Sequence, residues 1–288
     1  MDTSARSRLI SKTMTSFTPA SGSWAIITGA GSGIGRMLAL HFAAKGLKVA
    51  VLDISRETAE ETLALVQATG GAGRAEACDV SDEDAIKALA DRFTAEGVVP
   101  SMLWINAGVG SADTVGSGKP RTIRWLYDVN VLGAIWTAQA FLPLLRANAG
   151  ASRHVGITAS SASVVPVQAP FTLYAHTKQA TAAVGEALTA ELADEGIGVT
   201  ILCPGILNTE IWNSGRARPE RHGGSRSMPE EAGAHWREQP GPEILAGPID
   251  AVLSEGGGWC IVPTQDNRTQ RQMTERHAAQ QRGVRLPD

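Results

Sequence analysis

The sequence has few cysteines and only a small net charge. Among its 288 residues the cysteines are Cys78, Cys203 and Cys260, which lie far apart and show neither metal-ligand spacing nor a disulfide framework. We therefore expect a reducing, cytoplasmic location and no metal site. A formal net charge of -3 and a pI near 6.1 argue against a nucleic-acid-binding protein, which would be strongly basic.

Long hydrophobic runs are also lacking. No apolar run looks long enough to span a bilayer, so we expect no membrane segment. Residues 1–22 lack the apolar core of a secretory signal and are rich in serine and threonine. A transit peptide is one interpretation, and we favour a disordered tail because hydrophobicity is low. Residues 266–288 form a second polar tail, which could cover a site, reach a partner subunit or be disordered.

Between these tails, apolar runs alternate with segments of helical periodicity. Strands are expected at 24–28, 48–53, 74–80, 101–108, 153–160, 198–205 and 258–263, and helices at 34–46, 55–71, 81–97, 122–148, 172–194 and 243–256. Ser55 and Ser81 are the expected N-caps of the second and third helices, and Pro143 should bend or end the fourth. The alternation predicts one α/β domain over residues 23–265, with a Rossmann-type, doubly wound parallel sheet of about seven strands and helices on both faces.

One irregular stretch, residues 208–240, interrupts this alternation, and we call it the lid. Loops of this length are usually functional or disordered. The lid carries Trp212, Met228 and Trp236, which either line a pocket for a bulky apolar substrate or anchor the lid to the domain. Its arginines and glutamates balance in number, so a charged substrate is not indicated.

A glycine-rich segment, "ITGAGSGIG", joins the first strand to the first helix. Its glycines, Gly29, Gly31, Gly33 and Gly35, leave the backbone bare where a pyrophosphate can rest on the helix N-terminus. Asp53 ends the second strand, where a carboxylate accepts hydrogen bonds from an adenosine ribose and repels a 2′-phosphate. The glycine-rich segment and Asp53 together predict NAD as the cofactor in preference to NADP. Arg56 lies close enough to Asp53 in the sequence to leave NADP open.

Taken together in chain order, several short motifs resemble the short-chain dehydrogenase/reductase family. They are "TGAGSGIG", "CDV", "NAG", Asn130, "TASSAS", "YAHTK" and "CPG", and they cover the chain from about Trp24 to Pro263. The resemblance implies that Asp79 holds the adenine ring and that Pro204 and Gly205 flank the nicotinamide. It also implies that Thr209 binds the carboxamide or the phosphates. Further cofactor contacts expected from the same motifs are Ser32, Ile34, Val80, Asn106, Ala107, Gly108 and Ile206.

The chain departs from the family pattern at two places. Ile105 replaces the first asparagine of the usual "NNAG", and Ser163 stands where the serine motif usually ends in glycine. The family's spacing from Tyr174 points to Ser161 as the catalytic serine, whereas alignment on the strand and on Pro166 points to Ser160. We favour Ser160, because a strand fixes orientation better than the length of a loop does.

Tyr174 and Lys178 are four residues apart and so share one helix face. By resemblance, Tyr174 is the general acid/base, and we expect the neighbouring Lys178 ammonium and the positive nicotinamide ring both to lower its pKa. Lys178 should also hold the nicotinamide ribose, and Ser160 should stabilise the substrate oxygen. The resemblance assigns Asn130 to a helix distortion and to a water that links Lys178 to solvent.

The sequence thus predicts an NAD(H)-dependent oxidoreductase that interconverts a secondary alcohol and a ketone, with a preference for a hydrophobic, cyclic or aromatic substrate. The alternatives are a catalytically silent nucleotide sensor of the same fold, an NADP-dependent carbonyl reductase, and a lyase-type relative that has lost its nicotinamide site. The glycines argue against the lyase. The resemblance suggests a homodimer or homotetramer built from helices 122–148 and 172–194.

Overall fold

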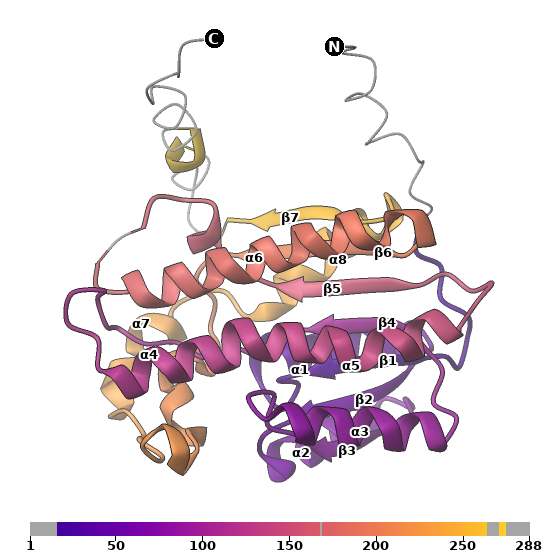
Figure 1. Cartoon of the computed structure of the whole chain (residues 1–288), viewed down its shortest axis with the longest axis horizontal. Coiled ribbons are helices and arrows are strands. Elements are labelled where there is room, and N and C mark those ends of the chain that lie inside the picture. Colours follow the sequence, from indigo (N-terminus) through magenta and orange to yellow (C-terminus); the bar gives the residue numbers. More distant parts are fainter. Residues whose placement is uncertain (1–15, 168, 264–270, 275–288) are drawn as a thin grey trace.

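The computed structural model of the chain describes residues 16–167, 169–263 and 271–274. Its strands are β1 (Trp24–Thr28), β2 (Lys48–Asp53), β3 (Gly73–Ala77), β4 (Pro100–Ile105), β5 (His154–Thr158), β6 (Gly198–Pro204) and β7 (Gly258–Val262). They form one sheet in the order β3-β2-β1-β4-β5-β6-β7, with every neighbouring pair parallel (Figure 1). The predicted seven-stranded, doubly wound fold is confirmed.

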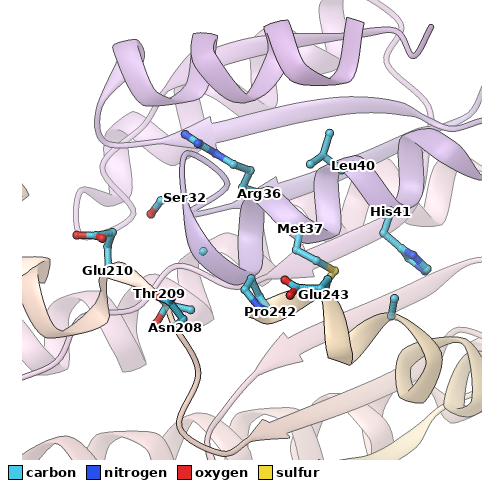
Figure 2. Close-up of a pocket in the computed structure, with 12 residues that line it drawn as sticks. Ser32, Arg36, Met37, Leu40, His41, Asn208, Thr209, Glu210, Pro242 and Glu243 are labelled. Atoms are coloured by element: carbon cyan, nitrogen blue, oxygen red, sulfur yellow. The ribbon is translucent and has the colours of Figure 1, made fainter. Parts of the chain in front are cut away.

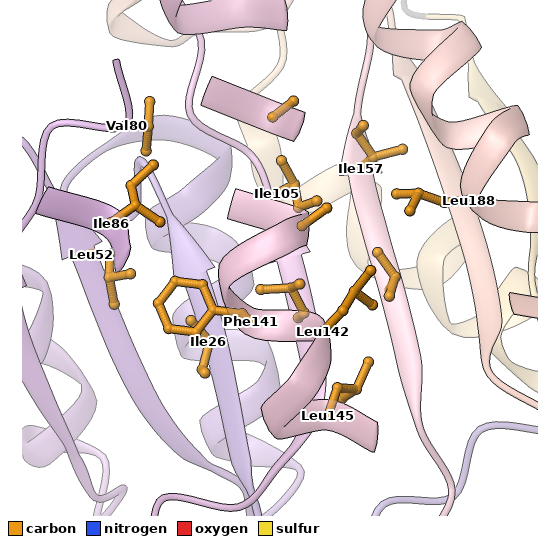
Figure 3. Packing of buried hydrophobic residues seen from close by; sticks show 14 of the residues in the cluster. Ile26, Leu52, Val80, Ile86, Ile105, Phe141, Leu142, Leu145, Ile157 and Leu188 are labelled. Carbon is orange, nitrogen blue, oxygen red and sulfur yellow. The ribbon is translucent and has the colours of Figure 1, made fainter. Parts of the chain in front are cut away.

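Helices cover both faces of this sheet. They are α1 (Gly33–Ala44), α2 (Arg56–Ala68), α3 (Glu83–Ala95), α4 (Pro120–Tyr127), α5 (Gly133–Ala147), α6 (Thr172–Leu192), α7 (Ala234–Arg237) and α8 (Ala246–Ser254). Two clusters of buried side chains separate the layers: α3, α5 and α6 pack on one face, and α1, α2 and α8 on the other. Figure 3 shows the first cluster, where Phe141 and Leu142 of α5 lie between strand residues such as Ile26 and Ile157.

The strand order reverses between β1 and β4, which are neighbours although two strands separate them in the chain. Loops that leave such a pair diverge to opposite sides and open a crevice at the carboxyl ends of the strands. The glycine-rich segment from Gly29 to Gly35, called the glycine turn below, follows β1, and the "NAG" segment follows β4. Both segments therefore border this crevice. All strands are parallel, and the segments after β2, β3, β5 and β6 therefore reach the same edge.

The predicted helix over 122–148 differs from the structure. It begins at Pro120 and runs to Ala147, but Asp128–Leu132 forms a π-helical turn that separates α4 from α5. Pro143 lies inside α5 and does not end it. The helix continues only four residues beyond Pro143. The distortion thus lies at Asn130, where the family resemblance placed it, and π turns of this kind are frequent at functional sites.

Two further expectations need correction. Ser81 does not cap the third helix; Asp82 does, by accepting a hydrogen bond from the Ala85 amide at 3.1 Å. The stretch Pro120–Ala147 is long and apolar enough, by length and composition, to span a membrane, contrary to our expectation. However, 56% of its apolar window is buried inside the domain, as in the core helix of a globular fold.

The described end of the predicted N-terminal tail packs against the domain. The Phe17 amide donates to the Leu253 carbonyl at 2.9 Å, and the Phe17 ring lies 5.4 Å from that of His154. Residues 1–15 and most of the predicted C-terminal tail lie outside the described residues. The three cysteines are free and buried.

Candidate active site

The glycine turn presents bare backbone at the start of α1. Gly29 and Gly33 have φ values of +63° and +52°, a region that favours glycine. A Cβ on Gly35 would collide with the Gly29 carbonyl oxygen, and one on Gly31 would lie 2.7 Å from Oδ2 of Asp53. Ser32 stands at the N-cap, but its side chain makes no capping hydrogen bond. The first-turn amides of α1 are thus left for an anion.

Asp53 is fixed beside this turn at the end of β2. Its Oδ2 accepts the Gly31 amide at 2.9 Å, and its Oδ1 accepts the Ser55 amide at 3.0 Å. The two nearby arginines each have a carboxylate partner on α2: Arg36 pairs with Glu61 at 3.0 Å, and Arg56 with Glu60 at 3.5 Å. The turn, the helix end and this carboxylate together suit the pyrophosphate and ribose of a dinucleotide.

Asn106, which follows β4, connects β4 to the end of β1 through hydrogen bonds. Its amide Nδ2 donates to the carbonyls of Thr28 and Gly29 at 3.1 and 3.2 Å, and its backbone amide donates to Oγ1 of Thr28 at 3.0 Å. Ala107 donates to the same hydroxyl at 3.1 Å. Ile105, the departure from the family pattern, is buried in β4. The central sheet is therefore joined across β1 and β4 without a second asparagine.

Ser160, Tyr174 and Lys178 meet where β5 and α6 approach each other. Ser160 follows β5, and Tyr174 lies in the first turn of α6; their hydroxyls are hydrogen-bonded. Lys178, one turn further along α6, is 3% exposed and donates from Nζ to the Thr158 carbonyl at 2.9 Å. Ser163 donates to the Lys178 carbonyl at 2.7 Å and so holds the loop after β5 against α6.

Burial controls the pKa values of both α6 side chains. It raises the pKa of Tyr174, while the Ser160 hydrogen bond lowers that pKa, with the smaller effect. Burial lowers the pKa of Lys178 to about 8. Our expectation that Lys178 lowers the tyrosine pKa therefore misses the largest cause, because desolvation disfavours phenolate and ammonium alike.

Asn130 is buried in the π turn beneath these groups. Its Nδ2 donates to the Val109 carbonyl and to Oγ1 of Thr177, both at 2.9 Å, and its Oδ1 accepts the Val109 amide at 2.8 Å. The side chain thereby joins the segment after β4 to α6. The water relay through Asn130 stays a prediction.

The segment after β6 returns to the glycine turn. The Gly205 amide donates to the Val262 carbonyl at 2.9 Å, and Ile206 is 38% exposed. Thr209 packs on the turn: its Cβ and Cγ2 lie 3.2 Å from the position that a Cβ on Gly33 would take. A pocket of about 630 Å³ opens here between α1 and the start of α8 (Figure 2). The pocket borders Ser32, Gly33 and Thr209. It does not border Ser160, Tyr174 and Lys178, which we call the Tyr174 group, so it adjoins the predicted phosphate end of the crevice.

The lid contacts residues that border the crevice and the end of α4. Ser214 accepts the Gly110 amide at 2.9 Å, and Arg221 donates to Oδ2 of Asp79 at 2.6 Å. His222 is buried beside Asp128, with 3.7 Å between Nε2 and Oδ2. Sequence reasoning missed these contacts, because each joins the lid to residues about 90 or more positions away and no local pattern marks them.

The apolar side chains of the lid differ in what they contact. Trp212 packs on the lid's own Gly233 and lies 5.6 Å from the Arg237 guanidinium, so these contacts join parts of the lid to each other. The Trp236 ring lies 6.4 Å from that of Phe171, which is 39% exposed and three residues before Tyr174. Met228 is 50% exposed. Trp236 thus contacts a residue that lies just before Tyr174 in the sequence.

Known proteins resemble the chain in sequence. The probable oxidoreductase EphD of Mycobacterium tuberculosis is 36% identical over 185 residues, which cover 64% of this chain and 31% of the relative. The chain thus spans about a third of that relative's length. Estradiol 17-beta-dehydrogenase 11 of Mus musculus is 35% identical over 215 residues, which cover 73% of this chain and 69% of the relative.

Solved structures resemble the fold. A short chain dehydrogenase/reductase from Burkholderia phymatum in complex with NAD is 26% identical, with a TM-score of 0.81 and coverage of 94% of this chain and 99% of that one. A metagenomic short-chain oxidoreductase in complex with NADP is 24% identical, with a TM-score of 0.67 and coverage of 85% and 99%. Likeness to both leaves the choice of dinucleotide open.

The family model for short chain dehydrogenases matches residues 23–220, more than half of the chain. That match spans the glycine turn, Asp53, Asp79, the "NAG" segment and the Ser160–Tyr174–Lys178 group, all of which the fold brings to one edge of the sheet. The chain therefore belongs to the short chain dehydrogenase family, with the NAD(P)-binding Rossmann fold of that family.

Proposed function

We propose that the protein is an NAD(H)-dependent oxidoreductase that interconverts a secondary alcohol and a ketone. The observation that carries this proposal is the group at the crevice: Ser160 and Lys178 are buried, and the half-buried Tyr174 is hydrogen-bonded to Ser160 and lies one helical turn from Lys178. A scaffold that only sensed nucleotide would have no need to bury an ammonium beside a phenol, because burial of a charged group is costly.

The side chains divide the chemistry as follows. Bound nicotinamide would supply the acceptor or donor of hydride. Tyr174 removes the proton of the alcohol in oxidation and returns it to the ketone oxygen in reduction. Ser160, on the same hydroxyl network, donates to the substrate oxygen and stabilises its developing negative charge. Lys178 holds the nicotinamide ribose, and Asn130 fixes the segment on which Lys178 rests.

We propose NAD in preference to NADP. Asp53 presents its carboxylate beside the glycine turn, where a 2′-phosphate would meet its negative charge. Arg36 and Arg56, the cations near that place, are both paired with glutamates of α2. An NADP-dependent carbonyl reductase would instead leave a cation there unpaired for the phosphate.

The proposed substrate is a bulky apolar secondary alcohol, cyclic or aromatic. Phe171 and Trp236 support this choice because their rings are in contact and Phe171 lies three residues before Tyr174. The name of the Mus musculus relative, an estradiol dehydrogenase, points in the same direction. For quaternary structure, we propose a homodimer or homotetramer through α4, α5 and α6, to be tested by light scattering.

One experiment separates the candidate functions. Steroid, cyclic and aliphatic secondary alcohols are screened with NAD and with NADP, and the reduced nicotinamide is followed by absorbance. Turnover with NAD that disappears in Tyr174→Phe is expected. Cofactor binding without turnover on any alcohol would favour the silent nucleotide sensor, and turnover with NADP alone would favour the carbonyl reductase.

A further inference from the structure

The lid touches the cofactor crevice at three separate places. Thr209 packs on Gly33 of the glycine turn, Ser214 bonds to Gly110 just after the "NAG" segment, and Arg221 bonds to Asp79 after β3. By the family resemblance, the glycine turn belongs to the phosphate part of the crevice and Asp79 to the adenine part, and the "NAG" segment lies beside the cofactor between β1 and β5. Residues 209–221 therefore contact the crevice at both its predicted phosphate part and its predicted adenine part.

The contact at Asp79 is the strongest of the three. Arg221 donates from Nη2 to Oδ2 of Asp79 at 2.6 Å and to Oγ of Ser81 at 2.8 Å. Asp79 is held on its other oxygen, because Oδ1 accepts the Ser81 amide at 2.9 Å and the Ser81 hydroxyl at 2.6 Å. A carboxylate has about four acceptor positions. One position on Asp79 thus stays open for a further donor, such as the amine of an adenine.

His222, the residue after Arg221, holds this part of the lid against the domain. His222 is 5% exposed and lies against Asp128, at the junction of α4 and the π turn. Arg221 is thus held between a buried lid residue and the carboxylate it bonds. Its side chain is 45% exposed and that of Asp79 is 18% exposed, so the guanidinium forms the solvent side of this part of the crevice.

We propose that Arg221 is a cofactor-positioning residue that completes the adenine subsite from the lid. It orients Asp79 toward the adenine amine and gives the ring a cationic outer wall, so that lid closure and adenine binding stabilise each other. This inference rests on the proposed dinucleotide cofactor. Coupling of this kind is reciprocal: what the lid adds to nucleotide affinity, the nucleotide adds to the stability of the closed lid.

The test compares nucleotide fragments in Arg221→Met and in a matched control, Arg226→Met, which changes an exposed lid arginine. Binding of NAD, ADP-ribose and nicotinamide mononucleotide is measured by calorimetry on the full chain. Arg221→Met should weaken NAD and ADP-ribose alike, by about fivefold or more, the lower end of typical couplings. The mononucleotide should bind as in the wild type, and the control should change nothing.

A double-mutant cycle with Asp79→Asn isolates the pair. In the Asp79→Asn background, Arg221→Met should have little further effect on NAD binding. Unchanged or tighter NAD binding in Arg221→Met would overturn the inference, and so would an equal loss for the mononucleotide, which would indicate general collapse of the lid. If the wild type bound neither NAD nor NADP, the proposed function itself would fail, and this inference with it.

Discussion

Replacing Lys178 with methionine should remove activity and yet reduce the cost of folding at neutral pH. Burial lowers the pKa of Lys178 from 10.5 to about 8, so the folded protein holds this proton less tightly than the unfolded chain does. At about 1.4 kcal/mol per pKa unit, the charged lysine opposes folding by about 3 kcal/mol below pH 8. Methionine removes that cost but leaves the Thr158 carbonyl without its donor, a loss of about 1–3 kcal/mol.

The pH dependence of this difference is the sharper quantity, because the loss at Thr158 does not titrate. Between pH 8 and 10.5 the unfolded chain keeps the proton that the folded protein has released, so wild-type stability rises with pH relative to Lys178→Met. Between pH 7 and about pH 9.5, the difference in free energy of unfolding between wild type and Lys178→Met should shift by about 2 kcal/mol in favour of the wild type. Above pH 10 the raised pKa of Tyr174 adds an opposing effect, so the comparison stops below that pH.

Urea unfolding of wild type, Lys178→Met and the exposed-site control Lys87→Met at the two pH values measures this change. The control should keep a constant difference from the wild type. A difference between wild type and Lys178→Met that stayed equal at both pH values would show that Lys178 titrates normally, and the argument from desolvation would be refuted.

Three further predictions concern the other site residues. Ser160→Ala should lower turnover by about two to three orders of magnitude and Ser161→Ala by much less, as for loss of one oxyanion donor; steady-state kinetics that rank them in reverse would favour the family spacing over the strand alignment. Asp53→Ser should reduce a preference for NAD that we expect to be about tenfold or more in the wild type, as measured by calorimetry with both dinucleotides. In Tyr127→Phe, Tyr174 is the last tyrosine, and its ultraviolet difference titration should give a pKa above 10 without NAD and a lower one with NAD; identical titrations would exclude cofactor assistance.

Features that depend on neighbours in the sequence were predictable here. β2 was expected at 48–53 and lies there, because its apolar residues are buried on both faces. The N-cap of α2 was likewise assigned correctly to Ser55, which accepts the Thr58 amide at 3.3 Å. Ser81 has the same chemistry but donates to Asp79 instead, so its choice of partner was decided by the crevice and not by the helix.

Features that depend on packing were not predictable. The ion pair between Arg221 and Asp79 joins residues 142 positions apart. The lid has no periodic pattern from which the position of Arg221 relative to Asp79 could be predicted. The pKa of Tyr174 was misjudged for the same reason. Spacing alone revealed Lys178 as its neighbour, whereas the burial that raises the tyrosine pKa comes from the surrounding fold.

The two α6 pKa values impose a condition on the proposed role of Tyr174 as a base. Lys178 can favour a phenolate only while it is charged, which for a pKa of about 8 means below about pH 8. Tyr174 forms a phenolate only above its own pKa, which burial has raised above its ordinary value of 10. These two pH ranges do not overlap in the protein by itself. A base at neutral pH therefore requires a further positive charge beside Tyr174, and an oxidised nicotinamide ring carries one. This reasoning favours an order of events in which the dinucleotide binds first and the alcohol second.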